Sequence, residues 1–133
     1  MAIVTINEIF RAARLRPGGR VPWGKPIPEN RPGVYVVALA DRKKIVYMGQ
    51  KIVYIGRTKR PLRKRLGEFY RHKYGARSPH RGGQAVLRLK GRRLVYCAAT
   101  SKWAAAEHKM IQHFKKKVVT LPWANRVRAA RES

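Results

Sequence analysis

Two tyrosines beside glycines are the first residues of this sequence whose types and spacing could support chemistry. Tyr35 closes the triplet Gly33-Val34-Tyr35, and Tyr54 opens the triplet Tyr54-Ile55-Gly56. Both triplets lie in runs rich in β-branched residues, which favour pleated, half-buried strands. On neighbouring strands the two phenols would share one small surface with exposed backbone around them. Such a surface is a candidate for proton transfer or for orienting a small reactant.

Glu107 is the second candidate, because it lies in the middle of the apolar face of a helix predicted over residues 101–117. An ionised carboxylate in that position costs several kcal/mol unless it is paired or bound to a metal. The chain has six Asp and Glu residues in all, so few carboxylates could serve as ligands of a divalent cation. A buried pair with an arginine explains Glu107 as well as a metal does, and both interpretations stay open here.

Further candidates lie on a second predicted helix, over residues 60–74, and in the basic loop 75–83 that follows it. Arg65 and His72 share one flank of this helix with Glu68. Arg63 projects elsewhere, and we expect it to be solvated or to face a phosphate. The loop contains His80, which could be catalytic or contact a phosphate, and Arg81, which could grip a phosphate. A solvated basic surface or a loop without a role explains these residues as well.

Charge dominates the composition. The 133 residues include thirty-two Lys and Arg but only six Asp and Glu, which gives a net charge of +26 and a pI near 11.6. Self-repulsion on this scale indicates a polyanionic partner, and nucleic acid is favoured over an acidic membrane surface because the cations are spread along the chain. The sequence has no apolar run long enough to span a membrane and no signal-peptide pattern. With the single cysteine, Cys97, these features favour a cytoplasmic protein without disulfides.

The elements that must position these residues can be read along the chain. A short helix is expected over 5–13, followed by a loop over 17–32 with no regular element, which Trp23 fastens to the body. Two β-segments lie within 33–58, and further strands are expected over 85–89 and 94–98. With the helices over 60–74 and 101–117, these elements describe one α+β domain.

The chain resembles the GIY-YIG nuclease family in the order of its motifs. These are Gly33-Val34-Tyr35, then Tyr54 to Thr58, then Arg65, Glu107 and Asn125. The resemblance covers roughly residues 33–126, with 1–32 as an N-terminal extension and 127–133 as a basic tail. It implies an α+β fold with a small central antiparallel sheet of about three strands, flanked by helices.

The resemblance also implies roles for single residues. Tyr35 and Tyr54 would surround the attacking water, Arg65 would hold the scissile phosphate, and Glu107 would be the lone protein ligand of Mg²⁺ or Mn²⁺. Asn125 would be a structural or site-bordering amide. Apart from these implied roles, we expect Arg57, Arg81 and Asn125 to contact the substrate. The implied activity is hydrolysis of DNA, with RNA as an alternative substrate, by a monomer or a homodimer. The base is a tyrosine, with its pKa lowered by the cations around it, or a histidine.

Two departures from the family pattern affect these roles. The segment 44–50 is almost repeated by 51–57, so Tyr47 competes with Tyr54 for the second tyrosine position. Tyr47 has the spacing usual in the family, but Tyr54 is followed by the glycine, arginine and helix start that the pattern requires, and we prefer it. Where many members carry a histidine this chain has Phe69, so His72 or His80 would have to take its place.

A non-catalytic, basic nucleic-acid-binding protein is the alternative function. It would bind DNA or RNA in a salt-sensitive way without cleaving it, and it would give Glu107 a permanent arginine partner. The nuclease requires Tyr35, Tyr54, Arg65 and Glu107 to converge in one cleft, whereas the binding protein does not.

Overall fold

A computed structural model describes residues 4–39, 52–71 and 92–118 together with residues 122 and 125. Its elements in chain order are α1 (Ile6–Ala12), β1 (Val21–Pro22), β2 (Gly33–Leu39), β3 (Ile52–Thr58), α2 (Leu62–Arg71), β4 (Arg93–Ala99) and α4 (Trp103–Val118). The expected strand over 85–89, the loop 75–83 and the first copy of the repeat at 44–50 lie outside the described residues.

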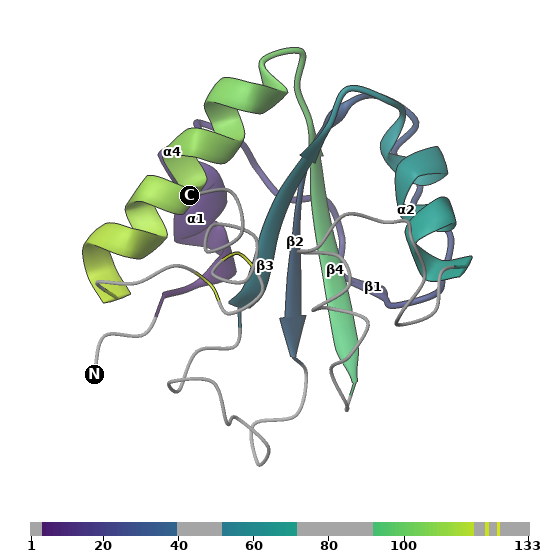
Figure 1. Cartoon of the computed structure of the whole chain (residues 1–133), viewed down its shortest axis with the longest axis horizontal. Helices are drawn as coiled ribbons and strands as arrows, with labels where there is room; N and C mark the ends of the chain where they lie inside the picture. The colour runs from purple at the N-terminus through teal and green to yellow at the C-terminus, as the bar shows by residue number, and fades with distance from the viewer. Residues whose placement is uncertain (1–3, 40–51, 72–91, 119–121, 123–124, 126–133) are drawn as a thin grey trace.

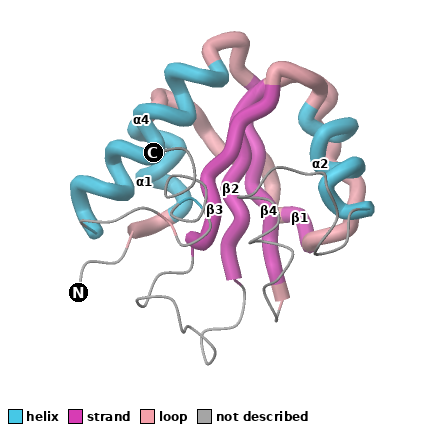
Figure 2. The backbone as a smooth tube through the Cα atoms, in the orientation of Figure 1, coloured by secondary structure: helices cyan, strands magenta, loops and turns pink. Residues whose placement is uncertain are grey.

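The described strands form one antiparallel sheet in the order β1-β4-β2-β3. Helices α1 and α4 cover one face of this sheet and α2 covers the other, as Figure 1 and Figure 2 show. The predicted α+β class with a small antiparallel sheet is therefore confirmed. The sheet has four strands rather than about three, because Val21–Pro22 pairs with Val95 and Leu94 of β4. The prediction of no regular element in 17–32 was wrong at this point, since an edge strand tolerates a proline.

Strand β2 lies in the middle of the main body of the sheet, and all seven of its residues are buried. Its side chains alternate between two cores, as the two-residue period of a strand requires. Tyr35 and Val37 face the core under α2, while Val34 and Val36 face the core under α1 and α4. Burial on both faces explains why β2 reads as an almost continuous apolar run.

The register between β2 and β3 decides where Tyr54 points. Tyr35 lies opposite Gly56 and Val37 lies opposite Tyr54 in regular pairing, and only beyond this point, where Ala38 lies opposite Ile52, is Val53 an extra residue in β3. Tyr54 therefore shares a face with Tyr35, in the core under α2. This pairing connects the two tyrosine triplets as the sequence predicted.

The three helices begin and end close to the predicted residues. Thr5 caps α1, since its Oγ1 accepts a hydrogen bond of 3.2 Å from the backbone N–H of Glu8. Helix α2 buries Leu62, Leu66 and Phe69, as its apolar period predicts. Three lysines in the last turn of α4 lie where cations favour the helix dipole.

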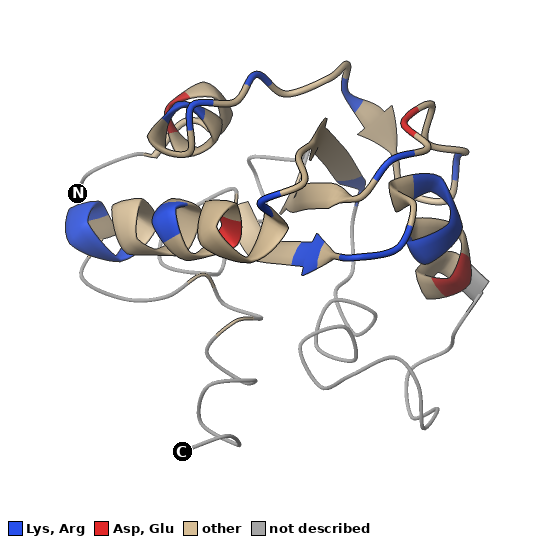
Figure 3. Ribbon diagram, turned by 90° about the horizontal axis from the view of Figure 1, so that it is seen from above, with Lys and Arg blue, Asp and Glu red and all other residues tan. Residues whose placement is uncertain are grey.

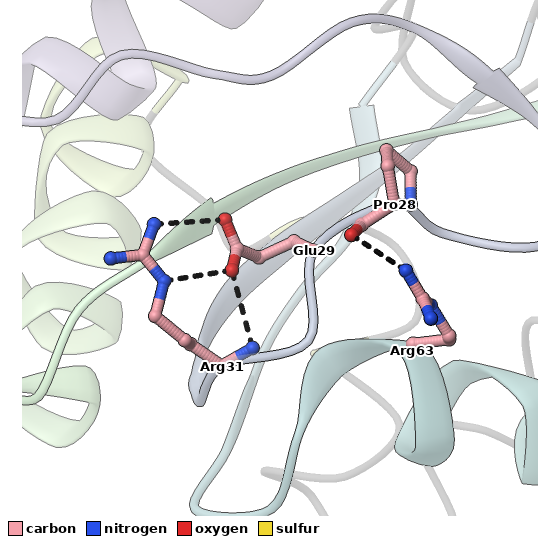
Figure 4. Close-up of polar contacts among 4 residues, drawn as sticks. All are labelled: Pro28, Glu29, Arg31 and Arg63. Atoms are coloured by element: carbon pink, nitrogen blue, oxygen red, sulfur yellow. Dashed lines mark hydrogen bonds and ion pairs between the residues drawn. The ribbon is translucent and has the colours of Figure 1, made fainter.

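The segment between α1 and β2 is held against α2. Trp23 packs edge-on against Phe69 and Tyr70, with ring centroids 4.9 Å apart in both pairs, which confirms its predicted packing role. Arg63 was expected to be solvated or to face phosphate. Its guanidinium instead donates hydrogen bonds to the carbonyls of Ile27 (2.8 Å) and Pro28 (2.9 Å), and Figure 4 shows the contact with Pro28.

None of the helices in the described parts of the chain is both long and apolar enough to cross a membrane.

Candidate functional site

The two tyrosines form the buried centre of the candidate site. The ring centroids of Tyr35 and Tyr54 are 6.0 Å apart, and neither residue is exposed to solvent. Gly56 lies directly against both rings. A Cβ at this position would be 2.5 Å from Cζ of Tyr35 and 2.8 Å from Cε2 of Tyr54, so a side chain here would collide with the pair. The glycine of the second triplet is needed because the Tyr35 ring occupies the space above it.

The hydroxyl of Tyr35 is influenced by charges on two helices and by the hydroxyl of Tyr54 on β3. Burial raises the pKa of Tyr35 to about 12, the positive charge of Arg65 and the hydroxyl of Tyr54 oppose this rise, and the negative charge of Glu107 adds to it. Tyr35 Oη is buried and makes no hydrogen bond of regular geometry to the described residues. We expected nearby cations to lower the pKa of a catalytic tyrosine. In this structure desolvation outweighs them, so Tyr35 is a neutral phenol near pH 7.

Glu107 is buried on α4, as predicted from its place on the apolar face, with 8% of its side chain exposed. Its Oε1 lies 3.8 Å from Nε of Arg57, an ion-pair distance that is too long for a hydrogen bond. The guanidinium of Arg57 also lies 5.5 Å from the ring centroid of Trp103, one helical turn before Glu107. The arginine partner that the alternative function requires is thus present, although the contact is long.

An open pocket of about 350 Å³ adjoins this buried centre. Its described lining combines the end of β3 (Arg57 and Thr58), the following turn (Lys59 and Arg60), Arg65 of α2 and Trp103 of α4. Figure 3 shows Lys and Arg gathered along the end of β3 and the start of α2. The pocket can therefore accept an anionic group between the two arginines that the sequence singled out.

Local hydrogen bonds fix the turn that forms one side of this pocket. Thr58 Oγ1 accepts from the N–H of Arg60 (3.0 Å) and donates to its carbonyl (3.2 Å). The Arg60 guanidinium donates two hydrogen bonds of 2.7 Å to Glu68, which holds the pKa of that carboxyl below its usual range. Glu68 engages Arg60, and Glu107 lies at ion-pair distance from Arg57. Among the described lining residues, Lys59 and Arg65 can therefore attract an anion without giving up one of these carboxylate contacts.

Asn125 connects the distant C-terminal part of the chain to the site. Its Oδ1 accepts a hydrogen bond of 2.8 Å from the N–H of Ile55, and its Nδ2 donates one of 2.9 Å to the carbonyl of Ile55. Both groups belong to the outer edge of β3, which no neighbouring strand among the described residues covers. The side chain of Asn125 therefore completes the backbone hydrogen bonding of the strand that carries Tyr54 and Arg57.

Several predicted site residues lie outside the described part of the chain: Tyr47, His72, His80 and Arg81. Three residues that line the pocket were not predicted, namely Lys59, Arg60 and Trp103. Their positions carried a signal, since Lys59 and Arg60 directly follow Thr58, the last residue of the second motif, and Trp103 lies four residues before Glu107.

Within the described residues, no three His, Cys, Asp or Glu side chains cluster closely enough to hold a metal ion by themselves. A cation at this site would thus depend on Glu107 as its described carboxylate ligand. Comparisons of the chain with protein-family models, with curated proteins and with solved structures gave no match.

Proposed function

We propose that this protein is a metal-dependent endonuclease that hydrolyses DNA phosphodiester bonds by in-line attack of water, in the manner of the GIY-YIG nucleases. The observation that carries the proposal is the convergence of Tyr35, Tyr54, Arg65 and Glu107 from four different elements. Arg65 and Glu107 both act electrostatically on the Tyr35 hydroxyl, and Arg65 lines the cationic pocket beside it. The α+β fold could form without these four side chains lying close together.

In this proposal the pocket binds the scissile phosphate. Arg65 and Arg57 flank the position of the phosphate and stabilise the negative charge that increases on its oxygens in the transition state. Tyr35, with a pKa of about 12, stays protonated at neutral pH. It therefore keeps its own proton, and one of the other candidate bases, Tyr54, His72 or His80, takes the proton of the attacking water.

The donor set fits a hard divalent cation such as Mg²⁺ or Mn²⁺. Glu107 offers a buried carboxylate oxygen that Arg57 approaches without a hydrogen bond. A single protein ligand suits Mg²⁺, which usually keeps several waters and takes its remaining ligands from phosphate oxygens. When bound, such an ion would polarise the phosphate and lower the pKa of a bound water. Arg57 would then release Glu107 and turn towards the phosphate.

The ion pair between Arg57 and Glu107 also favours a second function, that of a non-catalytic nucleic-acid-binding protein. In that case Arg57 neutralises Glu107 permanently, and the pair contributes only to the packing of β3 against α4. The net charge of +26 supports binding to nucleic acid in both cases. The two functions therefore differ in catalysis and not in affinity.

The test is nicking of supercoiled plasmid DNA by the purified full chain, with Mg²⁺, Mn²⁺ or EDTA. We expect nicking with the metals and none with EDTA. Glu107→Gln keeps the shape of the side chain and removes its charge, and Arg65→Ala removes the phosphate ligand. Each variant should nick at least about 100-fold more slowly, as the loss of one transition-state contact commonly does.

Two matched variants control for changes in overall charge. Glu8→Gln alters a carboxylate that pairs with Lys117 and does not line the pocket, and Lys64→Ala removes an exposed cation next to Arg65 in the chain. Both should nick within about threefold of the unchanged protein, since surface substitutions away from the site have small effects. Nicking by Glu107→Gln and Arg65→Ala at the unchanged rate would refute the nuclease. Salt-sensitive binding without metal-dependent nicking would establish the alternative.

A further inference from the structure

A second pocket, of about 430 Å³, lies on the other side of β2 from the proposed catalytic pocket. It is enclosed by the segment after α1, the segment before β2 and the end of β4. Its walls include the apolar side chains of Leu15, Val21 and Ile27, and the end of β4 contributes Cys97. Burial raises the pKa of the Cys97 thiol to about 12, so this cysteine is an apolar wall residue and not a nucleophile.

Hydrogen bonds on each side fix the walls of this pocket. The N–H of Gly18 donates to the carbonyl of Cys97 over 2.7 Å, which ties the first segment to β4. On the opposite side Arg63 holds the carbonyls of Ile27 and Pro28. The pocket is therefore formed before any ligand arrives, which reduces the entropy lost on binding.

The rim of the pocket is cationic. Arg14, Arg16 and Arg31 contribute three positive charges and Glu29 one negative charge, which leaves +2. Arg31 binds Glu29 through hydrogen bonds of 2.9 and 3.2 Å and holds the pKa of that carboxyl below its usual range, as Figure 4 shows for the contacts. Arg14 and Arg16 are exposed and form the part of the rim whose charge is not balanced by Glu29.

Arg14 has an unusual backbone conformation. It ends α1 with a φ of 59°, in the left-handed region, and its N–H donates to the carbonyl of Arg11 while that of Leu15 donates to the carbonyl of Phe10. This is a Schellman motif, in which glycine is the favoured residue at the position of Arg14. A long cationic side chain in this strained position, at the rim of a formed pocket, indicates a function for the guanidinium.

The pairing of Gly33 relates this pocket to the catalytic pocket. Gly33 lies opposite Thr58 of β3 on one side and Ala99 of β4 on the other. Thr58 lines the catalytic pocket and Ala99 lines the second pocket. Thr58 and Ala99 lie on the two strands that flank β2, so two strand spacings, about 10 Å, separate them. At a rise of about 3.4 Å per stacked nucleotide, this distance corresponds to roughly three nucleotides.

From these observations we propose that the second pocket binds one unpaired nucleotide of the DNA substrate, two to four nucleotides from the bond that is cut. Arg14 and Arg16 bind its phosphate, and the base lies against the apolar walls. A phosphate alone explains the cationic rim but not a formed pocket of this size whose walls are partly apolar. An unpaired base can enter the pocket, whereas a stacked and paired base cannot. The inference extends the proposed function and makes the protein specific for DNA structure.

The test compares two duplexes that differ only in one extra unpaired nucleotide in one strand. Binding by the full chain is measured by fluorescence anisotropy in EDTA, so that no cleavage occurs. We expect about tenfold tighter binding of the duplex with the unpaired nucleotide, which corresponds to about 1.4 kcal/mol. Arg14→Gly suits the left-handed backbone, so it should fold at least as stably as the unchanged protein and reduce this preference to about threefold or less. Arg16→Ala should have the same effect on the preference.

Two further variants separate the pocket from general charge. Arg20→Ala removes an exposed arginine that does not line the pocket, and it should weaken binding to both duplexes by the same factor. A Cβ at Gly19 would meet no atom within 4 Å, so Gly19→Leu places a side chain at the pocket without a backbone collision and removes no charge. It should abolish the preference.

Equal binding of the two duplexes, or an unchanged preference in Arg14→Gly, Arg16→Ala and Gly19→Leu, would overturn this inference and leave the nuclease proposal intact. Glu107→Gln lies outside the pocket and should retain the preference for the unpaired nucleotide. If the pocket variants lose the preference but no plasmid nicking is found, the proposed nucleotide pocket is supported and the proposed nuclease activity is refuted.

Discussion

Replacing Gly56 with alanine tests the geometry of the candidate site directly. The new Cβ would lie 2.5 Å from Cζ and 2.7 Å from Oη of Tyr35, and 2.8 Å from Cε2 of Tyr54. Ordinary van der Waals contact begins near 3.4 Å, so the Tyr35 ring would have to retreat by about 0.9 Å, the difference between 3.4 and 2.5 Å. Both tyrosines are fully buried, and the surrounding core must move with them.

The cost follows from this displacement. Overpacking of a well-packed core usually destabilises by about 1–3 kcal/mol. For a chain of 133 residues, this loss lowers the melting temperature by roughly 4–11 °C. The same displacement moves the Tyr35 hydroxyl relative to Arg65 and Glu107. If the site is catalytic, a shift of about 1 Å should slow DNA cleavage by about 100-fold at a temperature where the variant is still folded.

Thermal unfolding followed by circular dichroism measures the first effect, and plasmid nicking measures the second. Gly19→Ala is the matched control, because a Cβ there would meet nothing within 4 Å and the backbone φ is not left-handed. The control should be neutral or slightly stabilising. If Gly56→Ala melts at the same temperature as the unchanged protein, the Tyr35 ring does not lie over this glycine and the described site is wrong.

Two further perturbations test the burial of Tyr35 and the role of Asn125. The pKa of Tyr35 is raised from its ordinary value of 10 to about 12, so the stability that its neutral form contributes is present below pH 10 and is lost as the pH rises through 12. The contribution is about 2–3 kcal/mol. In urea unfolding, Tyr35→Phe should therefore gain stability relative to the unchanged protein between pH 10 and 12; a difference that is independent of pH would contradict the burial. Asn125→Ala removes both hydrogen bonds to Ile55 and leaves two buried backbone groups of β3 without them. We expect a loss of about 2–4 kcal/mol in the free energy of unfolding, measured with denaturant, and a loss below about 0.5 kcal/mol would show that residue 125 does not complete this edge.

Local patterns in the sequence were sufficient to predict most of the elements. The apolar period of α4 placed Glu107 on a buried face, and the β-branched runs around the two tyrosine triplets predicted β2 and β3. These signals are local because a helix or a strand repeats every few residues. The loop that Trp23 fastens was also predicted, since a large aromatic ring in a loop rich in proline and glycine needs a surface to cover it.

Contacts between distant segments were not predictable in this way. The pairing of Val21 with Val95 made a fourth strand out of a proline-containing loop. The binding of Ile55 by Asn125 joins residues 70 positions apart. Arg63 was expected to face solvent, and it binds the carbonyls of Ile27 and Pro28 instead. In a chain with 32 cations, no local pattern distinguishes the arginine that stabilises a loop from the arginine that binds a phosphate.

The sequence by itself determined the residue types available for chemistry, the strong positive charge and the helix face on which the rare carboxylate Glu107 lies. Only the tertiary structure decided what these residues can do. The pairing of β2 with β3 brings Tyr54 to the side of Tyr35, and packing on both faces of the sheet buries the two rings. Burial then raises the pKa of Tyr35 to about 12, although a positive charge lies nearby. Whether a tyrosine accepts a proton or keeps its own depends on desolvation, and desolvation is a property of the folded chain.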